Sequence, residues 1–401
     1  MSATSKLVAL NPMLRFIGVA SALGAPSPDC RDGAESLRRM GIEAAIRRTG
    51  LDAGWGTSIE APDGPRLPAL AALLRELAAE VRGSVATGHV PVVLGGDHAI
   101  AAGTWRGVGA ALGGAPGLLW IDAHLDAHTP DSSPSHNAHG MPLAALLGVG
   151  APEMTRIAGP DLDPARVAVI GVRSYEAEEM RFLAARGVQV FGMAEILRRG
   201  LAAVMADALA IVGADDSPFG ISLDIDALDP QFAPGVTTPS DNGLGVAELA
   251  TAIGGLIRNR RCLAFEIVEY CPSRDALGLT ARAAIELLEA ACRPGGEALQ
   301  CIEAARGASN YAPLPVVLSE GRGCWLSDVN GQRYLDLMSA YSAVSFGHAH
   351  PRLVATLASQ ATRLAVTSRA YFNDRLPLFL KRLTDLTGYE RALPVNTGLE
   401  A

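Results

Sequence analysis

The sequence predicts an α/β fold, in which a parallel β-sheet carries helices on both faces in three layers, followed by a shorter, truncated α+β segment. Short apolar runs alternate with longer amphipathic stretches from about residue 14 to residue 292, which is typical of strand–helix–strand units. The runs are apolar at almost every position, as expected for strands that are buried on both faces. Seven runs are predicted strands: residues 15–20, 91–95, 117–122, 166–171, 188–192, 219–225 and 263–269.

Two of the stretches between these runs are clear helix candidates. Residues 67–88 and 246–261 repeat apolar side chains at the spacing of one helix face. In an open parallel sheet, ligands bind beyond the carboxyl ends of the strands. The polar residues that follow the apolar runs, among them His98, Asp122 and Asp224, are therefore the first candidates for a functional site.

The composition indicates a globular protein with a large core, since 49% of the 401 residues are hydrophobic and 19% are charged. A net charge of −8 argues against a nucleic-acid or membrane-surface partner, because both are bound through basic patches. The sequence has no run of about twenty apolar residues that could cross a membrane. The six cysteines form no Cys-x-x-Cys pair, which favours reduced thiols and a cytoplasmic location.

The length favours two structural units. Arg-Pro-Gly-Gly at residues 293–296 is expected to stop a helix and open a linker. We therefore expect a first domain over residues 1–295, a linker over 296–306 and a separate, incomplete segment over 307–401. Within that segment, residues 324–337 are predicted to form a hairpin whose turn is Asn330-Gly331.

Acidic and imidazole side chains stand at alternate positions where predicted strands end. Side chains two positions apart in a strand project to the same side, so each set is expected to converge on one point. Together with a histidine after residue 95 they make six potential ligands: His98, Asp122, His124, Asp126, Asp224 and Asp226. Crowded carboxylates repel one another unless a multiply charged cation lies among them. The pattern predicts a two-metal site.

Each part of this pattern has an ordinary alternative. A single Asp after a strand often caps a helix or a turn, and a lone His beside Gly is often structural. The combination at three strand ends favours metal binding. Carboxylate and imidazole ligands without thiolate favour Mn²⁺, with Co²⁺, Fe²⁺ and Zn²⁺ as competitors. Two such ions generate hydroxide near neutral pH, so we predict metal-assisted hydrolysis.

Five motifs carry a specific resemblance. GGDHAIAAG, DAHLDAHTP, SHNAHGMPLA, SLDIDALDP and EIVEYCP occur in this order and resemble the ureohydrolase family, most closely its arginase branch, over residues 14–292. The resemblance implies two Mn²⁺ ions per chain and hydrolysis of L-arginine to L-ornithine and urea. One ion would take His98, Asp122, Asp126 and Asp224, and the other Asp122, His124, Asp224 and Asp226, with Asp122 and Asp224 bridging.

The resemblance also implies three catalytic residues: the metal ligand Asp126, His139 and Glu269. His139 matches the proton-shuttling histidine, and Glu269 matches the carboxylate that binds the guanidinium group. A carboxylate suits this task because it accepts hydrogen bonds from a planar guanidinium in pairs. From the residues alone, His139 could equally be a loop histidine and Glu269 a helix cap. Asp229 is assigned to a turn or to support of the ligands.

Substrate choice lies between arginine and agmatine or another guanidino compound. By resemblance, Ser133, Ser135 and Asn137 would hold an α-carboxylate, and Glu176 and Glu179 an α-ammonium group. The resemblance also places His128 and Thr238 among the substrate contacts. The alternative is that the serines and Asn137 only build a surface turn. Three departures bear on the substrate contacts: His128 stands where many arginases carry Asn, His136 replaces a common Gly, and Glu176 replaces a shorter Asp.

Residues 307–401 resemble the start of a class III, PLP-dependent transaminase of the ornithine aminotransferase type. The resemblance gives Tyr311 and Tyr341 substrate contacts in a complete enzyme and makes Thr397, Gly398 and Leu399 a vestigial phosphate-binding turn. PLP chemistry needs a Schiff-base lysine. Lys381 lies in an amphipathic helical stretch and is expected to face solvent, so PLP is not expected in this chain.

The two resemblances together favour arginine as the substrate, because ornithine is what arginine hydrolysis yields. They also imply a homo-oligomer, a trimer or a hexamer, or one part of a bifunctional enzyme. Two hypotheses of other classes stay open: a PLP transaminase whose first unit is a scaffold, and a metal-free α/β binding protein.

Overall fold

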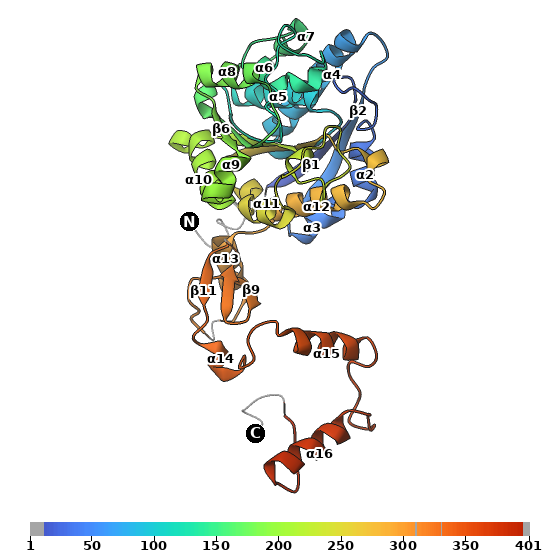
Figure 1. The fold of residues 1–401 in the computed structure, drawn as a ribbon, viewed down its shortest axis with the longest axis vertical. Coiled ribbons are helices and arrows are strands. Elements are labelled where there is room, and N and C mark those ends of the chain that lie inside the picture. The colour runs from blue at the N-terminus through green and yellow to red at the C-terminus, as the bar shows by residue number, and fades with distance from the viewer. Residues whose placement is uncertain (1–11, 309–310, 330, 396–401) are drawn as a thin grey trace. The chain divides into compact units, whose positions relative to one another are not determined.

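The computed structural model describes residues 12–308, 311–329 and 331–395. Its centre is an eight-stranded sheet in which every neighbouring pair is parallel, in the order β2-β1-β3-β8-β7-β4-β5-β6 (Figure 1). The strands are β1 (Met13–Ala20), β2 (Ala53–Glu60), β3 (His89–Leu94), β4 (Gly117–Ile121), β5 (Val167–Val172), β6 (Gln189–Gly192), β7 (Phe219–Asp224) and β8 (Cys262–Val268).

Helices cover both faces of the sheet and give three layers (Figure 1). One face carries α2 (Gly33–Arg39), α3 (Ile42–Arg48), α9 (Met193–Arg199), α10 (Leu201–Val212), α11 (Val246–Ala252) and α12 (Leu279–Cys292). The other face carries α4 (Arg66–Ala86), α5 (Ala101–Leu112), α6 (Pro142–Leu146), α7 (Pro152–Thr155) and α8 (Ala177–Arg186).

Alternating strand residues enter the two cores that these helices close. Phe16 and Leu119 belong to the first core, whereas their neighbours Ile17 and Trp120 belong to the second. This alternation explains why the strands are apolar at almost every position: each side chain has a helix layer to pack against. The predicted fold class is therefore confirmed.

The seven predicted strands are all present, and β2 is an additional strand that the sequence pattern did not predict. Its sequence, AGWGTSIE, pairs only with β1 at the edge of the sheet, and much of it is exposed or half-buried. An edge strand buries fewer side chains, so it lacks the apolar run that marks the inner strands.

The prediction of one helix over residues 246–261 was wrong, because the helix is shorter. Helix α11 ends at Ala252, and a separate 3₁₀ turn covers Leu256–Arg258. Gly255 has φ +74°, a left-handed conformation that glycine adopts without steric strain. The Gly254-Gly255 pair thus ends a pattern whose apolar spacing alone continues.

The chain divides into two compact units, of which the second begins at Leu318; residues 329–331 group with the first. The expected helix stop is observed, since α12 ends at Cys292. Residues 296–306, the predicted linker, form helix α13 (Gly296–Arg306). Gly295 and Gly296 allow the break, while the following residues EALQCIEAA have high helix propensity.

The second unit has a three-stranded antiparallel sheet, in the order β11-β10-β9. Strands β10 (Trp325–Asp328) and β11 (Arg333–Leu335) pair as the predicted hairpin, whose Asn330 lies outside the described residues. The remaining elements are β9 (Leu318–Arg322), α14 (Ser339–Ser342), α15 (Pro351–Ala361) and α16 (Leu376–Thr387). Neither α15 nor α16 buries a residue.

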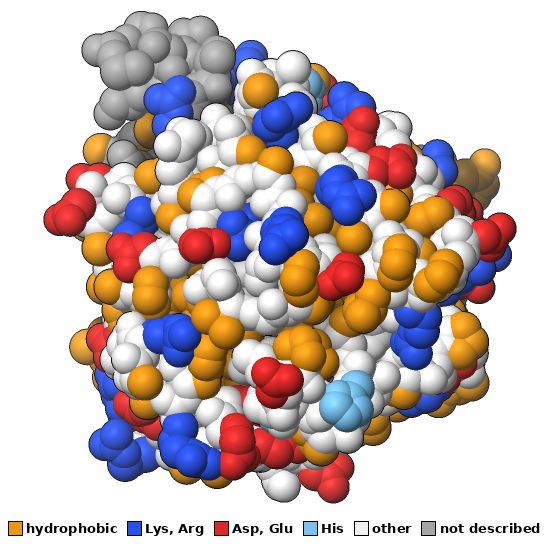
Figure 2. Space-filling view, turned by 90° about the horizontal axis from the view of Figure 1, so that it is seen from above, with side chains coloured by type: hydrophobic (Ala, Val, Ile, Leu, Met, Phe, Trp, Pro, Cys, Tyr) orange, Lys and Arg blue, Asp and Glu red, His pale blue; other side chains and the backbone are white. Residues whose placement is uncertain are grey.

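Acidic and basic side chains are interspersed over the face that Figure 2 shows, without a large patch of either sign. Among the described residues, the helices are all too short or too polar to cross a bilayer.

Candidate metal centre and active site

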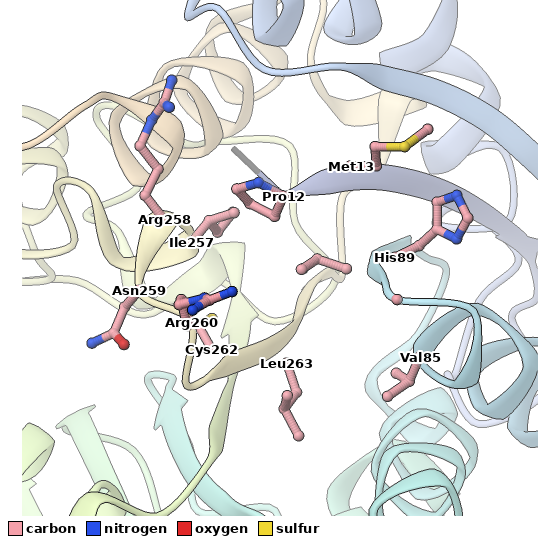
Figure 3. Close-up of a pocket in the computed structure, with 12 residues that line it drawn as sticks. Pro12, Met13, Val85, His89, Ile257, Arg258, Asn259, Arg260, Cys262 and Leu263 are labelled. Atoms are coloured by element: carbon pink, nitrogen blue, oxygen red, sulfur yellow. The ribbon is translucent and has the colours of Figure 1, made fainter. Parts of the chain in front are cut away.

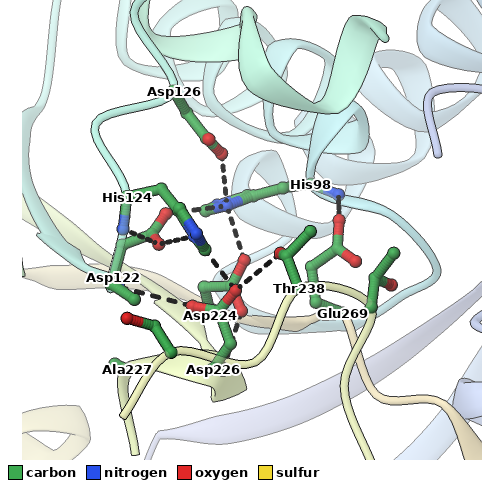
Figure 4. A network of polar contacts seen from close by, with 12 residues as sticks. His98, Asp122, His124, Asp126, Asp224, Asp226, Ala227, Thr238 and Glu269 are labelled. Atoms are coloured by element: carbon green, nitrogen blue, oxygen red, sulfur yellow. Dashed lines mark hydrogen bonds and ion pairs between the residues drawn. The ribbon is translucent and has the colours of Figure 1, made fainter. Parts of the chain in front are cut away.

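Four adjacent inner strands bring the predicted ligands together. Strands β3, β8, β7 and β4 are neighbours in the sheet, and their carboxyl ends lie at the same edge. His98 follows β3, Glu269 follows β8, Asp224 ends β7 and Asp122 follows β4. Figure 4 shows the side chains of His98, Asp122 and Asp224 directed at one another from these strand ends.

The side chains of residues 122–126 converge for a different reason than predicted. Strand β4 ends at Ile121, so these residues do not alternate along a strand. The backbone turns instead: the His124 N–H donates to Asp122 Oδ1 at 2.7 Å, and Asp126 has φ +48°. The left-handed conformation of Asp126, uncommon for a residue with a β-carbon, aims its carboxylate back at His98.

The first ligand group surrounds His98. Its Nδ1 lies 3.2 Å from Asp122 Oδ2, 2.9 Å from Asp126 Oδ2 and 3.2 Å from Asp224 Oδ2. All four residues are buried, and one ligand atom of each lies within 4.8 Å of the others. Such spacing suits donors that share one ion.

The second ligand group consists of Asp122, His124 and Asp226. His124 Nδ1 lies 3.4 Å from Asp122 Oδ1 and 3.1 Å from Asp226 Oδ2. Asp122 thus faces the first group with Oδ2 and the second with Oδ1, the arrangement of a bridging carboxylate. Asp224, the other predicted bridge, belongs only to the first group, and its Oδ1 accepts the Asp226 N–H at 2.9 Å.

The orientation of His98 fits metal binding. Its Nε2 lies 3.0 Å from the hydroxyl of Ser222, which donates to Glu266 Oε2 at 2.7 Å. The hydroxyl hydrogen is therefore used, and His98 must donate from Nε2, which leaves the Nδ1 lone pair directed at three carboxylates. Nδ1 is buried without a well-aligned hydrogen-bond partner among the described residues. Three carboxylate oxygens around this nitrogen need a positive charge beside them, which a metal ion, or a proton on Nδ1, supplies.

Trp120 fixes the same corner of the site. Its ring stacks on the His98 imidazole, with centroids 4.1 Å apart, and its indole N–H donates to Asp122 Oδ2 at 2.9 Å. One buried side chain therefore restrains two ligands.

The ionisation of the cluster reflects crowding of like charges. Burial and the charge of Asp122 raise the pKa of Asp126 to about 6. Burial also raises the pKa of Asp224 well above its ordinary value. For His98, burial opposes protonation, but the three carboxylates outweigh it and raise its pKa well above the usual range. The raised pKa values of His98 and His124 mean that protonated histidines offset part of the carboxylate charge when no metal is bound.

His139 and Glu269 form a pair beside the cluster. His139 Nδ1 lies 3.1 Å from Glu269 Oε1, which also accepts the backbone N–H of His98 at 2.8 Å. The N-cap of the 3₁₀ turn His98–Ile100 is Asp97, and Glu269 accepts the first N–H of that turn, as the alternative considered for it partly expects. Its Oε2, however, is buried without a hydrogen-bond partner among the described residues. Burial alone would lower the pKa of His139, but Glu269 outweighs it and raises that pKa to about 9.

Two cavities differ sharply in chemistry. The larger, of about 430 Å³, lies at the amino ends of β1, β3 and β8 and is lined by Met13, His89, Arg260 and Cys262 among others (Figure 3). No acidic residue is found among the described residues that line it. The smaller, of about 250 Å³, lies at the carboxyl ends, and His124, Asp126 and Asp224 open onto it. Chemistry, not size, identifies the smaller cavity as the candidate active site.

Five of the predicted substrate contacts line this cavity: His128, Ser135, Glu176, Glu179 and Thr238. His128 Nε2 lies 3.0 Å from Glu176 Oε2, and Glu179 accepts the backbone N–H groups of Ala127 and Glu176. His139 also lines the cavity and contacts Glu269, which does not.

Ser133 and Asn137 are not among the residues that line the cavity. The Ser133 hydroxyl accepts the N–H of His136 at 3.0 Å, which is the turn-building role considered as the alternative. Asp229 accepts the N–H groups of Gln231 and Gly243, as its assignment to a turn predicts.

The aminotransferase-type residues predicted in 307–401 are exposed or lie outside the described residues. Tyr311 and Tyr341 are exposed, Thr397, Gly398 and Leu399 lie outside the described residues, and the Lys381 side chain is 73% exposed beside Asp385.

Several residues near the site were not predicted from the sequence: Asp97, Trp120, Ser174, Ser222, Glu266 and Arg173. Two of them carried a signal. Ser222 stands two positions before Asp224 on the same strand, and Glu266 interrupts an otherwise apolar run. A charged residue inside a strand that is buried on both faces needs a partner, and here it has Thr104, Trp105 and Ser222.

A three-layer α/β fold with a buried, shared histidine–aspartate cluster defines a metal-dependent hydrolase of the ureohydrolase type. Residues 13–292 match the Arginase family. An arginase from Bacillus caldovelox is 36% identical over 288 residues, which span 69% of this chain and 96% of that protein. The crystal structure of the B. caldovelox arginase superimposes with a TM-score of 0.67 over 70% of this chain and 98% of that one. The chain belongs to the arginase family.

Residues 306–401 match the class-III aminotransferases. An ornithine aminotransferase from Halalkalibacterium halodurans is 50% identical over 95 residues, 24% of this chain and 24% of that protein. The chain therefore joins an arginase-family domain to a segment similar to about a quarter of an aminotransferase.

Proposed function

We propose that this protein hydrolyses L-arginine to L-ornithine and urea at a pair of Mn²⁺ ions. The observation that carries the proposal is Asp122, whose two carboxylate oxygens face two different ligand groups. Two further findings support it: the chain belongs to the arginase family, and its similarity to arginases extends over nearly the whole length of those proteins.

One ion would be held by His98, Asp122, Asp126 and Asp224, and the other by Asp122, His124 and Asp226. The four carboxylates bring four negative charges, which two dications would balance. Carboxylate and imidazole donors without thiolate favour Mn²⁺ among the available dications. When bound, such a pair of ions lowers the pKa of water and so supplies hydroxide near neutral pH.

Glu269 would bind the substrate guanidinium. Its unpartnered, buried Oε2 needs a hydrogen-bond donor, and a guanidinium offers two in parallel. The substrate would exchange with His139 as the partner of Glu269. His139, which lines the cavity, would then hold a proton at Nδ1 for the amine that leaves when the guanidinium carbon gains the hydroxyl oxygen.

The far end of the cavity would select the amino-acid end of arginine. Glu176 would accept the α-ammonium group, while His128 and Ser135 would donate to the α-carboxylate. Agmatine lacks that carboxylate and would not form these hydrogen bonds, so it should bind less tightly than arginine. The aminotransferase-like segment agrees with this choice, because it is similar to an enzyme named for ornithine, the product of arginine hydrolysis.

The test combines manganese analysis with urea release from L-arginine and from agmatine. We expect about two Mn²⁺ per chain and a higher kcat/KM for arginine. Asp122→Asn should weaken both ions because both share this residue, whereas Asp229→Asn, a turn aspartate of the same region, should keep them. A preference for agmatine, or urea release without metal, would overturn the proposal.

We also propose that residues 1–295 suffice for this reaction, that residues 307–401 carry no PLP and no transaminase activity, and that the protein assembles as a trimer or hexamer. Light scattering coupled to size-exclusion chromatography measures the assembly directly. A PLP absorbance band that survives dialysis would contradict the second point.

A further inference from the structure

Arg173 occupies an unusual position directly after β5. Its guanidinium is surrounded by backbone carbonyl groups of two other segments, residues 226–228 and 240–241, as well as of its own. Nη2 donates to Asp226 O at 2.8 Å, Leu228 O at 3.1 Å and Ser240 O at 2.7 Å; Nη1 donates to Gly171 O and Ala227 O, both at 3.2 Å; and Nε donates to Asp241 O at 3.0 Å.

One of these segments carries a residue of the second ligand group, and the other follows a residue that contacts it. Residues 226–228 include Asp226, a predicted ligand whose carbonyl Arg173 holds. Residues 240 and 241 follow Thr238, whose hydroxyl donates to Asp226 Oδ2 at 3.1 Å. Arg173 therefore holds the backbone of Asp226 and the backbone beyond its side-chain partner at the same time.

The other end of the Thr238 loop is held in the same way. Arg274 donates to Val236 O at 3.2 Å and Thr237 O at 2.9 Å. The loop thus has an arginine at each end, and only Arg173 also reaches the segment that carries Asp226.

We infer that Arg173 is a positioning residue for the second metal position, where it fixes Asp226 and Thr238 relative to each other. This inference rests on the proposed two-metal function. A guanidinium is suited to the task because it presents five N–H donors in a rigid plane, whereas a lysine ammonium has three on a flexible stem. Loss of the fork should let the Asp226 carboxylate move relative to Asp122 and His124.

The same strand supplies a matched control. Arg166 precedes β5 at its amino end and donates to Ala115 O at 3.2 Å, Val212 O at 3.3 Å and Pro218 O at 2.8 Å. It also joins separate segments through carbonyl groups, but it contacts neither the ligand residues nor their loops in the described structure. A lysine at either position removes the guanidinium hydrogen bonds that join separate segments through their carbonyl groups.

The experiment compares Mn²⁺ binding to the full-length wild type, R173K and R166K. The free Mn²⁺ signal in electron paramagnetic resonance gives both dissociation constants, and H124N marks the ion that belongs to the second group. In R173K we expect about a ten- to hundredfold weaker second ion, with the first ion unchanged. The spectrum should change from that of a coupled pair to that of an isolated ion, and kcat should fall more than KM rises. R166K should lower the melting temperature as R173K does but bind both ions normally.

Two results would overturn the inference: R173K that binds both ions with wild-type affinity, or R166K that loses the second ion equally. If R173K does not yield folded protein, R173Q, which keeps an amide donor, takes its place with the same two criteria. Failure of the proposed function is distinguishable, because then the wild type itself would bind no pair of ions.

Discussion

The six predicted metal ligands behave as one chemical unit. In the metal-free protein the carboxylates hold the pKa of His98 and His124 far above the ordinary histidine value, against the effect of burial. Metal binding must displace those protons, so apparent metal affinity should rise with pH. This exchange explains how four buried carboxylates can share one site in a folded chain that has not yet bound its ions.

His139 allows a test in which the sign is fixed. Its folded pKa, raised to about 9, exceeds the value of about 6.5 in an unfolded chain. The stabilisation is therefore complete below about pH 6.5 and is lost as the pH rises through about 9. Between these limits, His139 makes the unfolding free energy of the metal-free wild type fall by about 1.4 kcal/mol for each unit by which the pH rises. His139→Gln should remove this contribution. Urea denaturation at several pH values measures this slope, and parallel curves for variant and wild type would contradict the assignment.

Glu269→Gln tests recognition of the guanidinium. The amide has the shape of the carboxylate but not its charge, so the charge-assisted hydrogen bonds are lost. Hydrogen bonds to a charged group contribute about 1.5–3 kcal/mol, so kcat/KM for arginine should fall by roughly ten- to 150-fold. The metal content should be retained. An unchanged kcat/KM would mean that another group binds the guanidinium.

At the scale of elements, β7 and β8 support the metal site through a contact between their side chains. Ser222 on β7 links His98 to Glu266 on β8, so Ser222→Ala removes one partner from each. We expect about a ten- to hundredfold loss in affinity for the ion at His98 and about 1–3 kcal/mol of lost stability. Metal titration and denaturant unfolding measure both effects.

Ser84→Ala is the matched control for this variant. Ser84 is also buried, in α4, but its hydroxyl has no hydrogen-bond partner within the described part of the chain. Its removal should leave metal affinity unchanged and stability within about 1 kcal/mol of the wild type. If both serine variants bind metal normally, the link from Ser222 to His98 has no functional weight.

Turns between elements set the direction of key side chains. Asp126 and Glu269 both have positive φ, +48° and +65°, which side chains with a β-carbon rarely adopt. Neither residue is followed by a signal of such a turn in the sequence. The surrounding hydrogen bonds, among them Leu143 N–H to Asp126 O and Glu269 N–H to Gly96 O, hold these conformations.

At the scale of the whole molecule, the two units bury their apolar side chains very differently. In the second unit Phe372, Leu337 and Val366 are 95%, 87% and 86% exposed. Apolar surface of this kind promotes association. A chain that stops after residue 306, and so keeps α13, should retain full urea release and scatter less light than the full-length chain.

Activity assays and light scattering on both chains test this expectation. An inactive or insoluble truncated chain would show that residues beyond 306 are needed for the fold of the first unit.

The sequence by itself determined the inner strands and pointed to the residues of the candidate site. Apolar runs such as residues 117–121 are local and strong because both faces of each strand are buried, and polar residues at the strand ends stand out against them. The edge strand β2 was not predicted, because an exposed strand has no continuous apolar run. The break after Ala252 was not predicted either, because the two glycines that cause it do not interrupt the apolar spacing.

Only the tertiary structure decided which strand ends meet. The order β3-β8-β7-β4 puts residues 98, 269, 224 and 122 side by side, although they are far apart in the chain and in a different sequence order. It also decided that Ser133 builds a turn and that Arg173 holds the loops around Asp226. Periodicity reports the environment of each segment, whereas strand order and backbone clamps depend on contacts between distant segments, which no local pattern records.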